Sequence, residues 1–490
     1  MDSSSSSLKN RPSAQEPIQE EVNYSHGVLY SPSAPSTKFN IAELKSRGIS
    51  YVRIQWLDFT NILRFRVVPV AYFQKLMESS RPGVNIAKAS LGLVNLIMSE
   101  EFTSMGEYLY VPDLSSIRIC PYAPGHASVM GWFEEKTPVK YSDGKESVKV
   151  ELCSRSVLKR IVEEAKAAGI EFLVGVESEF ILLQSTNPIQ AVNEHQFSAS
   201  AGLLSGSVEA LVMQEIADAI QESGIELQLY HPEAAPGQYE VVPAPMAPLE
   251  AADAVVHVRE TIINVAAKHG LRATFAPRVY MSSTGSAAHT HISVHAAGVE
   301  KPKECLSKQE SYFLAGVLEH LPALPAVTLP IPASYKRVAD GAWSGGTYVC
   351  WGTENREAPI RLVNADSPGS RRFEMRFIDG TANPYIVLAG ILGAGSAGIQ
   401  TQHHLKLKDC PGPKSAAEMT EEARQALGIT KRMPLSWEEA RNNFCNDDCI
   451  RTVFGDEFIK KYLSVNKILG NVLDVDEDES LALKRLVEFY

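Results

Sequence analysis

Arginines and carboxylates alternate in residues 371–377, a pattern that suits binding of an anionic ligand. The run reads Arg-Arg-Phe-Glu-Met-Arg-Phe, and a strand sends alternate side chains to opposite faces, so Arg372, Glu374 and Arg376 share one face. An isolated strand of this kind could simply present its charges to water. More arginines lie close by in the sequence, however, at Arg337 and at Arg356 and Arg361, which bracket an apparent second strand over 355–361. Because guanidinium groups bind phosphate and carboxylate oxygens in pairs, the cluster predicts a pocket for a nucleotide polyphosphate and a carboxylate.

Three further motifs bring carboxylates and imidazoles together. Glu177 and Glu179 lie two residues apart in an expected strand and point the same way, so at a separation of about 4 Å they would repel by roughly 4 kcal/mol at an effective dielectric of 20. A cation between them removes that repulsion, whereas a solvated strand edge is the simpler interpretation of this pair alone. The other two motifs add Glu233 and Glu240 around a Pro-Gly turn, and His289, His291 and Ser293 on one alternating face. Together with Glu374 they predict two divalent sites that favour Mg²⁺ or Mn²⁺ over zinc.

Length, charge and cysteine usage limit the classes of protein to which the chain can belong. The chain has 490 residues, 44% of them hydrophobic, which is enough for two domains with a large buried core. Its formal net charge of -11 argues against nucleic acid as a partner, since binding to the phosphate backbone needs a basic surface. Seven scattered cysteines favour reduced thiols, and no basic N-terminal segment precedes an apolar run, so we expect a cytoplasmic protein without a secretory signal.

The longest uncharged stretch, 380–402, is long enough to cross a membrane but contains Asn383, Pro384 and several glycines. A buried helix is therefore expected there, and no membrane partner. The same stretch contains Gly393-Ala-Gly-Ser-Ala-Gly398, a formal match to the dinucleotide-binding fingerprint. That fingerprint should follow a strand and open a helix, whereas here it ends an apolar helical segment, so its small residues predict close helix packing instead.

The chain divides into three parts of different character. Residues 1–37 are rich in Ser and Pro and predict a disordered tail, and residues 38–145 predict a small α+β domain with two strands around a turn at 58–61. In residues 146–490, expected helices end at a glycine and lead into a strand, which predicts an α+β catalytic domain with a mostly antiparallel sheet flanked by helices. The helices are expected at 154–168, 208–223 and 251–269, the strands at 171–183, 225–230 and 273–277, and the chain from 434 onward is expected to be helical.

The order of these motifs resembles that of glutamine synthetase. It runs Gly-x-Glu-x-Glu-Phe, Glu…Gly-Gln-x-Glu, Gly-Ser-x-x-His-x-His-x-Ser, Asn-Arg…Arg, and Arg-x-Glu-x-Arg-Phe-x-Asp…Ala-Asn-Pro-Tyr, and it covers about residues 40–470. The chain is similar to class I-like fungal members, including some fused to an amidohydrolase domain, which is not expected in this chain. The resemblance implies a glutamine synthetase-like fold in which the N-terminal domain, 38–145, is β-grasp-like. It also implies ATP, two or three Mg²⁺ or Mn²⁺ ions, and a homo-oligomer of stacked double rings, a dodecamer.

The resemblance also implies a role for each of the residues named above. Glu179, Glu233 and Glu240 would hold the first metal, and Glu177, His289 and Glu374 the second. His291 and Ser293 would contact the nucleotide, and Arg356, Arg361 and Arg372 its phosphates, with Arg356 acting in catalysis. Arg337, Arg376 and Gly285 would bind the carboxylate substrate, and Asp58 of a neighbouring subunit would complete the amine site.

Four positions depart from the family pattern. The flap glutamate that takes a proton from ammonium falls at or near Trp343, and no glutamate occurs between Arg337 and Glu354, so a shifted alignment would not restore this base. An aromatic wall at Trp343 suits an organic amine, and family members that make γ-glutamyl amides of amines also lack the flap glutamate. The other departures are Gly369 for a lysine in the Ser-Pro-Lys turn, Thr284 for an asparagine before Gly-Ser, and Asn61 for a glycine in the Asp-x-x-Gly turn.

Three functions remain open from the sequence. The first is an ATP-dependent ligase that phosphorylates a carboxylate, because a carboxylate is a poor electrophile, and then joins the acyl group of glutamate, through its γ-carboxyl, or of a similar acid to an organic amine. The second is glutamine synthetase itself, using ammonia. The third is a non-catalytic relative with a structural or regulatory role. Because the metal and phosphate positions are kept while the amine positions change, the sequence favours the first.

Overall fold

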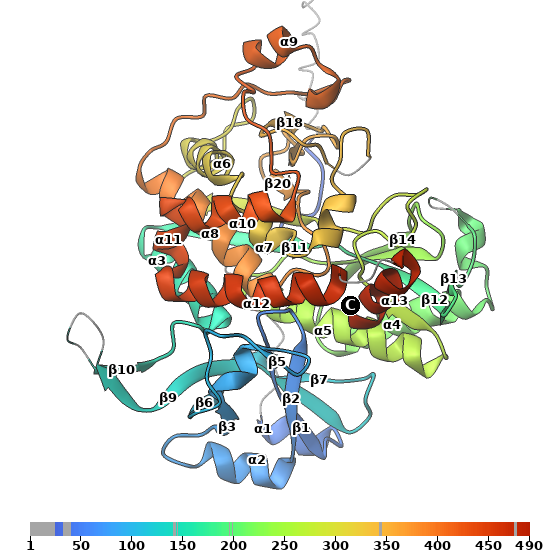
Figure 1. Ribbon diagram of the computed structural model, residues 1–490, viewed down its shortest axis with the longest axis vertical. Coiled ribbons are helices and arrows are strands. Elements are labelled where there is room, and N and C mark those ends of the chain that lie inside the picture. The colour runs from blue at the N-terminus through green and yellow to red at the C-terminus, as the bar shows by residue number, and fades with distance from the viewer. Residues whose placement is uncertain are drawn as a thin grey trace, which may run out of the picture.

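The computed structural model describes residues 25–32, 41–140, 144, 146–195, 197, 199–342, 345–474 and 478–490. Most of the expected tail, apart from 25–32, lies outside these residues, and so does Trp343. A small N-terminal domain, blue to cyan in Figure 1, lies below a larger domain coloured green to red. The expected α+β class is confirmed, with sheets that are mostly antiparallel.

The small domain contains two four-stranded sheets, with strand orders β2-β1-β8-β7 and β10-β9-β6-β3. The first is built around β1, which pairs antiparallel with β2 and parallel with β8. Because β10 pairs with β9, the second sheet runs to Lys149, past the expected domain boundary at 145. The elements are α1 (Ile41–Ser46), β1 (Tyr51–Leu57), β2 (Leu63–Pro69), α2 (Val70–Met77), β3 (Val84–Ala87), β4 (Leu93–Val94), β5 (Ile97–Met98), β6 (Glu107–Pro112), β7 (Arg118–Ile119), β8 (His126–Val129), β9 (Gly131–Lys140) and β10 (Glu146–Lys149).

Two larger sheets form the centre of the catalytic domain. One has the order β11-β17-β20-β19-β18, and the other has the order β13-β12-β15-β14 with β16 paired to β12. Every pairing in them is antiparallel except that of β18 with β19. The strands are β11 (Ile170–Val176), β12 (Ser178–Thr186), β13 (Ile189–Ala191), β14 (Leu227–Pro232), β15 (Gln238–Pro243), β16 (Arg272–Thr274), β17 (Thr290–Ala296), β18 (Trp351–Thr353), β19 (Ile360–Val363) and β20 (Arg372–Met375).

Two strand predictions differ from the structure. The single strand expected over 171–183 is two strands, because the chain leaves one sheet after Val176 and enters the other at Ser178. Glu177 is the residue between them, so it does not share a strand face with Glu179. The strand expected over 355–361 begins only at Ile360, and Arg356 lies in the exposed turn before it.

Helices cover the two sheets, and one helix, α8, is buried along most of its length. Helix α8 occupies most of the uncharged stretch 380–402, which confirms the expected buried helix. A Cβ added at Gly316 of α6 would lie 2.4 Å from the carbonyl oxygen of Ala394 and 2.8 Å from Cα of Gly398, so these glycines allow α6 and α8 to pack backbone to backbone. The helices are α3 (Ser154–Ala167), α4 (Val208–Glu222), α5 (Pro248–Lys268), α6 (Lys308–His320), α7 (Pro325–Thr328), α8 (Pro384–Gln400), α9 (Glu421–Ala426), α10 (Trp437–Asn446), α11 (Asp448–Phe454), α12 (Asp456–Asp474) and α13 (Glu479–Phe489).

The three helices expected from periodicity are α3, α4 and α5. Each is followed within two residues by a glycine at positive φ, namely Gly169, Gly224 and Gly270, as the stop signals predict. A buried ion pair between Arg155 of α3 and Asp253 of α5 ties two of them together at 2.8 Å. Within the described part of the chain, no helix is both long and apolar enough to span a bilayer.

Candidate active site

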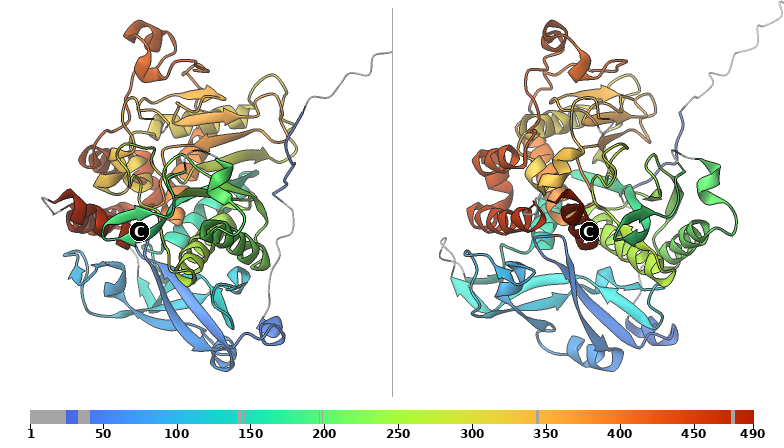
Figure 2. Two further views of the ribbon diagram at one scale, coloured as in Figure 1. Left: turned by 90° about the vertical axis from the view of Figure 1, so that its right-hand side faces the viewer. Right: turned by 45° about the vertical axis from the view of Figure 1, so that its right-hand side comes forward.

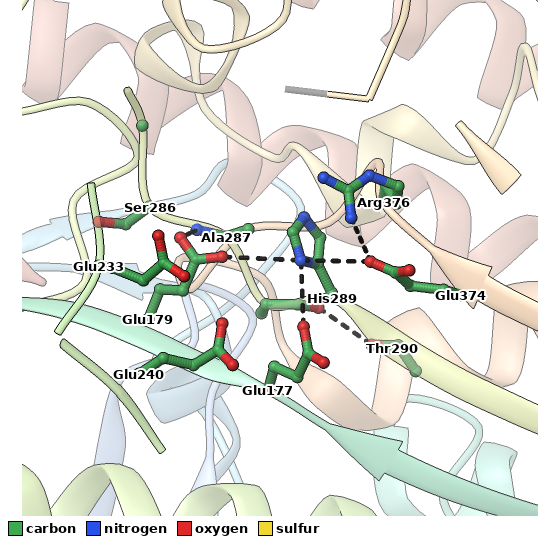
Figure 3. Close-up of polar contacts among 12 residues, drawn as sticks. Glu177, Glu179, Glu233, Glu240, Ser286, Ala287, His289, Thr290, Glu374 and Arg376 are labelled. Carbon is green, nitrogen blue, oxygen red and sulfur yellow. Dashed lines mark hydrogen bonds and ion pairs between the residues drawn. The ribbon is translucent and has the colours of Figure 1, made fainter. Parts of the chain in front are cut away.

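Five glutamates converge where the two large sheets meet. Glu179 on β12 lies directly opposite Glu240 on β15, and both side chains are less than a tenth exposed. Figure 3 shows the carboxyl groups of Glu177, Glu179, Glu233 and Glu240 around one space, with His289 between Glu179 and Glu374. Strands hold Glu179, Glu240 and Glu374, and the other two glutamates lie directly beside strand ends, so the sheets bring the carboxylates together.

Glu233 and Glu240 approach a histidine that the sequence analysis did not select. His231 on β14 pairs with Glu240 in register, and its Nε2 lies 3.3 Å from a Glu240 oxygen while its Nδ1 lies 3.8 Å from Glu233. The hydrogen bond to Glu240 raises the pKa of His231 to about 9. The three ligand atoms lie within 4.8 Å of one another, as a metal site requires. The spacing His-x-Glu at 231–233 was the available signal, because alternate residues of a strand share a face.

The second group forms around His289 and His291. Nδ1 of His289 lies 3.2 Å from Glu177 and 3.6 Å from both Glu179 and Glu374. His291 approaches Glu177 even more closely, with Nε2 at 2.8 Å, and its ligand atom lies within 4.8 Å of those of Glu177 and Glu374. The structure therefore brings together the residues expected at the second metal and adds His291 to them.

Burial and like charge act strongly on the first group of carboxylates. Burial, with Glu240 and Glu233 nearby, raises the pKa of Glu179 to about 8. Burial also raises the pKa of Glu240 to about 7 and that of Glu233 above its usual value. These side chains therefore lie where their mutual repulsion is costly. A divalent cation among them would remove that cost, so the residues present fit oxygen-ligated Mg²⁺ or Mn²⁺.

Neighbouring imidazole and guanidinium groups instead stabilise the charge of Glu374. Although burial acts against it, His289 and Arg376 lower the pKa of Glu374 to about 2. Arg376 donates to one oxygen of this carboxylate, and Arg361 donates to the other at 3.1 Å. Burial lowers the pKa of His289 to about 4, helped by Arg376, so its imidazole is neutral near pH 7 and can act as a ligand.

Arg372 reaches the same cluster through His291. Its Nε donates to Nδ1 of His291 at 3.0 Å, so the imidazole proton lies on Nε2 and is donated to Glu177. This chain of contacts connects a guanidinium directly to the carboxylate cluster. The alternating face predicted for 372–376 is therefore confirmed, and it points inward because both faces of β20 are covered.

Two cavities approach the carboxylate cluster. A cavity of about 500 Å³ is lined by Glu177, His291, Ser293 and Arg372, among others. A second, of about 320 Å³, is lined by residues that include Gly285 and Arg337. The buried Arg337 donates to Nε2 of His289 at 3.4 Å, so the second cavity also borders the cluster. At Gly285 a Cβ would lie 2.4 Å from the carbonyl oxygen of Pro277 and 2.7 Å from Cγ of Arg337, so the site requires glycine there.

Several expected site residues are not brought into the cluster. The Asp58 carboxylate accepts hydrogen bonds from Thr60, from the Ile62 amide and from Arg64, all in its own domain, and its side chain is only 1% exposed. A role in the amine site of a neighbouring subunit stays a prediction, and these contacts weigh against it. Arg356 lies on an exposed turn and acts on Glu233 as a nearby positive charge.

Asp340, near the expected flap, is also engaged elsewhere. Its carboxylate binds Arg432 at 2.7 and 2.8 Å and accepts from Thr347. These contacts lower its pKa, and they occupy the group that the flap could have offered as a base. Trp343 itself lies outside the described residues.

Comparison with known proteins agrees with this geometry. Protein fluG of Emericella nidulans is 35% identical over 458 residues, which cover 90% of this chain and 49% of fluG, so the chain spans about half the length of that relative. Gamma-glutamylpolyamine synthetase GlnA3 of Streptomyces coelicolor is 30% identical, over 90% of this chain and 94% of its own. A solved structure described as a novel glutamine synthase homolog superposes with a TM-score of 0.73 at 25% identity, over 90% of this chain and 99% of that one. Residues 151–470, well over half of the chain, match the glutamine synthetase catalytic domain, and the chain belongs to that family.

Proposed function

We propose that the chain is an ATP-dependent ligase that joins the γ-carboxyl group of glutamate, or a similar acid, to an organic amine. One observation carries the proposal: the carboxylate cluster lies between two cavities of different size, each with its own arginine. The larger, of about 500 Å³, suits a nucleotide and reaches Arg372, and the smaller, of about 320 Å³, suits an amino acid and reaches Arg337. Phosphoryl transfer needs the phosphate donor and the acceptor on either side of the groups that hold the metal ions, which here would be the clustered carboxylates.

In the first step, a carboxylate oxygen of the acid attacks the γ-phosphorus, and the bond between that phosphorus and the bridging oxygen of ADP breaks. Arg372 and Arg361 would bind the phosphate oxygens, and Arg337 would hold the acid within reach. Divalent cations at the glutamates would neutralise charge that develops on the transferred group. Glu374 keeps Arg361 and Arg376 in place through its two oxygens.

In the second step, the amine nitrogen attacks the acyl carbon, phosphate leaves with the C–O electron pair, and the nitrogen loses a proton. Two carboxylates that could take that proton, Asp58 and Asp340, are both bound by arginines in their own neighbourhoods. A nucleophile that is easily deprotonated, or one whose organic part helps to position it, has less need of a dedicated base. This supports an organic amine over ammonium.

The relatives support the same direction without deciding the amine. GlnA3 is described as a gamma-glutamylpolyamine synthetase, so one relative that aligns over nearly its whole length uses an organic amine by its printed name. Glutamine synthetase of Methanocaldococcus jannaschii matches at the same 30% identity. Identity alone therefore favours neither nucleophile, and the changed flap position supports an organic amine as the second substrate.

The test measures phosphate release by the 490-residue chain with ATP, Mg²⁺ or Mn²⁺, and glutamate. Ammonium, a small alkylamine, a diamine, a polyamine and an aromatic amine are compared at equal concentration, and mass spectrometry identifies the amide. We expect at least one organic amine to be used faster than ammonium. Equal or faster turnover with ammonium would instead identify a glutamine synthetase, and absence of phosphate release with every nucleophile would indicate the non-catalytic alternative.

We further propose that the chain assembles with copies of itself into stacked rings, as the family resemblance implies. Analytical ultracentrifugation at micromolar concentration tests this, since a ring of subunits sediments far faster than a protein of 53.7 kDa. A monomer as the sole species would reject it.

A further inference from the structure

The N-terminal segment 25–32 lies against the catalytic domain, although the small domain follows it in sequence. Figure 2 shows this short blue segment beside the orange and green elements, away from the other blue ones. One end is fixed to the loop 364–370. The amide of His26 donates to Oγ of Ser367 at 3.1 Å, its carbonyl accepts from Oγ of Ser370 at 2.6 Å, and its Nε2 lies 3.1 Å from Oδ1 of Asn364.

The other end is fixed beside strand β14. The Tyr30 hydroxyl donates to a Glu226 oxygen at 3.0 Å and accepts from Nε2 of Gln228 at 2.9 Å. Loop 364–370 and the start of β14 both contribute to the lining of the larger cavity, as do Gly27, Val28 and Tyr30 themselves. The segment therefore bridges two sides of that cavity and forms part of its wall.

The volume that remains shows that the segment does not fill the cavity. With segment 25–32 in place, the cavity still has a volume of about 500 Å³, which lies within the usual range for small-ligand sites. Arg372, His291 and Glu177 line the same space, and a polyphosphate would be attracted to this arginine end. Val28 and Tyr30 offer apolar surface, and a planar base suits such a surface.

Two glycines fit the segment to the loop. Gly27 has φ +92°, and a Cβ there would lie 2.8 Å from Cβ of Ser370, so its conformation and its close approach both require glycine. At Gly369 a Cβ would lie 2.6 Å from Cδ2 of Leu29. The family resemblance expects a lysine at position 369. In this chain Leu29 lies where that side chain would begin, so the departure at 369 and the presence of the segment are matched.

We propose that segment 25–32 is a built-in wall of the nucleotide site, so that affinity for a nucleoside di- or triphosphate depends on this segment. The inference rests on the proposed function, because it takes the larger cavity as the nucleotide site. It adds to it a part of the chain outside the match to the catalytic domain, residues 151–470. The segment confines the base end of the nucleotide, and Gly369 is the substitution that makes room for it.

The experiment measures binding of ADP with Mg²⁺ to the 490-residue chain by calorimetry. Gly27→Ala forces a Cβ into Ser370, Tyr30→Ala removes both hydrogen bonds at the other end, and Gly369→Lys displaces Leu29. Gly48→Ala is the matched control, because Gly48 also has positive φ (+72°) but nothing within 4 Å of its Cβ position, and it belongs to the small domain. Thermal melting checks that each variant is folded.

We expect the three segment variants to bind ADP at least about fivefold more weakly than the parent, and Gly48→Ala to bind as the parent does. Hydrogen exchange in residues 25–32 should slow when ADP binds the parent. If the parent binds ADP and all three segment variants bind it with the same affinity, the role of the segment as a wall is wrong, while the proposed function is unaffected. Tighter ADP binding in those variants would also overturn it, because the segment would then obstruct the site. Failure of the parent to bind any nucleotide would instead reject the proposed function, and the wall with it.

Discussion

Glu179 and Glu240 face each other directly across two neighbouring antiparallel strands, and both carboxyl groups are buried. Like charges placed opposite each other in a sheet destabilise it, and here Glu233 adds a third. The strand pairing therefore holds mutually repelling carboxyl groups together at the point where the two cavities approach each other. A cation bound among these groups would offset the repulsion, which supports the proposed metal site.

Glu179→Gln should abolish stabilisation by metal while leaving the metal-free protein as stable as the parent or more so. The substitution removes a ligand, and it also removes one of three mutually repelling buried carboxylates. Melting temperature is compared with and without millimolar Mg²⁺ or Mn²⁺, since a ligand that binds the native state raises it. Glu163→Gln, at an exposed position of α3, is the control. An undiminished metal-induced shift in Glu179→Gln would show that the ligands lie elsewhere.

The two cavities should respond separately to arginine substitution. Arg372→Lys is expected to weaken nucleotide binding by about tenfold or more, and Arg337→Lys to raise KM for the acid by a similar factor, because lysine cannot reproduce a two-pronged contact. Calorimetry with ADP and initial rates at varied acid concentration measure the two effects. If Arg337→Lys weakened ADP and left the acid unaffected, the assignment of the cavities would have to be exchanged.

Asp58→Asn should act on stability more than on catalysis. The carboxylate accepts from two backbone amides, one hydroxyl and Arg64, so the neutral amide is expected to lower the free energy of unfolding by about 2 to 4 kcal/mol. Denaturant unfolding measures this, and kcat is measured on the same preparation. A variant of parental stability with kcat reduced more than a hundredfold would assign Asp58 to an amine site instead.

Trp343→Glu should increase the use of ammonium relative to the best organic amine. A carboxylate at this flap position supplies a proton acceptor, and general-base catalysis contributes about 10²- to 10⁴-fold. Trp343→Phe keeps an aromatic surface and serves as the control. The measured quantity is the ratio of kcat/KM values for the two nucleophiles, and an unchanged ratio in Trp343→Glu would reject the role given to this position.

His257 should make the protein less stable in mild acid. Burial, with Arg118 nearby, lowers the pKa of His257 in the folded state from 6.5 to about 3. The unfolded chain therefore takes up a proton below pH 6.5 that the folded protein refuses until about pH 3. Stability from this group is complete above pH 6.5 and falls as the pH drops, by at most about 1.4 kcal/mol per pH unit.

His257→Gln removes that titration, so its unfolding free energy should fall less between pH 6.5 and 5 than that of the parent. Denaturant titrations at several pH values measure the difference, and His269→Gln, at a partly exposed histidine, is the comparison. Parallel curves for parent and His257→Gln would show that His257 is not the responsible group.

Local patterns predicted the elements whose signals are themselves local. The helices α3, α4 and α5 followed from apolar periodicity and terminal glycines, and the inward face of β20 followed from alternation of charged and apolar residues. The clustering of candidate site residues was predictable in the same way only where a motif alternates within one strand, as on β17 and β20. Glu177 and Glu179 do not share a face, because the chain changes sheets between them.

The sequence did not predict the features that depend on the pairing of distant strands. The passage from one sheet to the other at Glu177 cannot be read from an apolar run, since both strands are buried and equally β-prone. The pairing of His231 with Glu240 depends on a register set by the turn between β14 and β15. Tyr30, in a segment expected to be disordered, contacts Gln228, which lies 198 positions away in the sequence. No local signal marks this contact.

The passage of the chain at Glu177 has a consequence for how ligands act on one another. Its carboxylate lines the larger cavity and also holds His289 and His291. A nucleotide and a cation that both contact this side chain are therefore linked ligands: when one reorients Glu177, it changes the affinity of the other, and reciprocity requires the same factor in the opposite direction. A single residue outside both strands would thereby make the two proposed sites one thermodynamic unit.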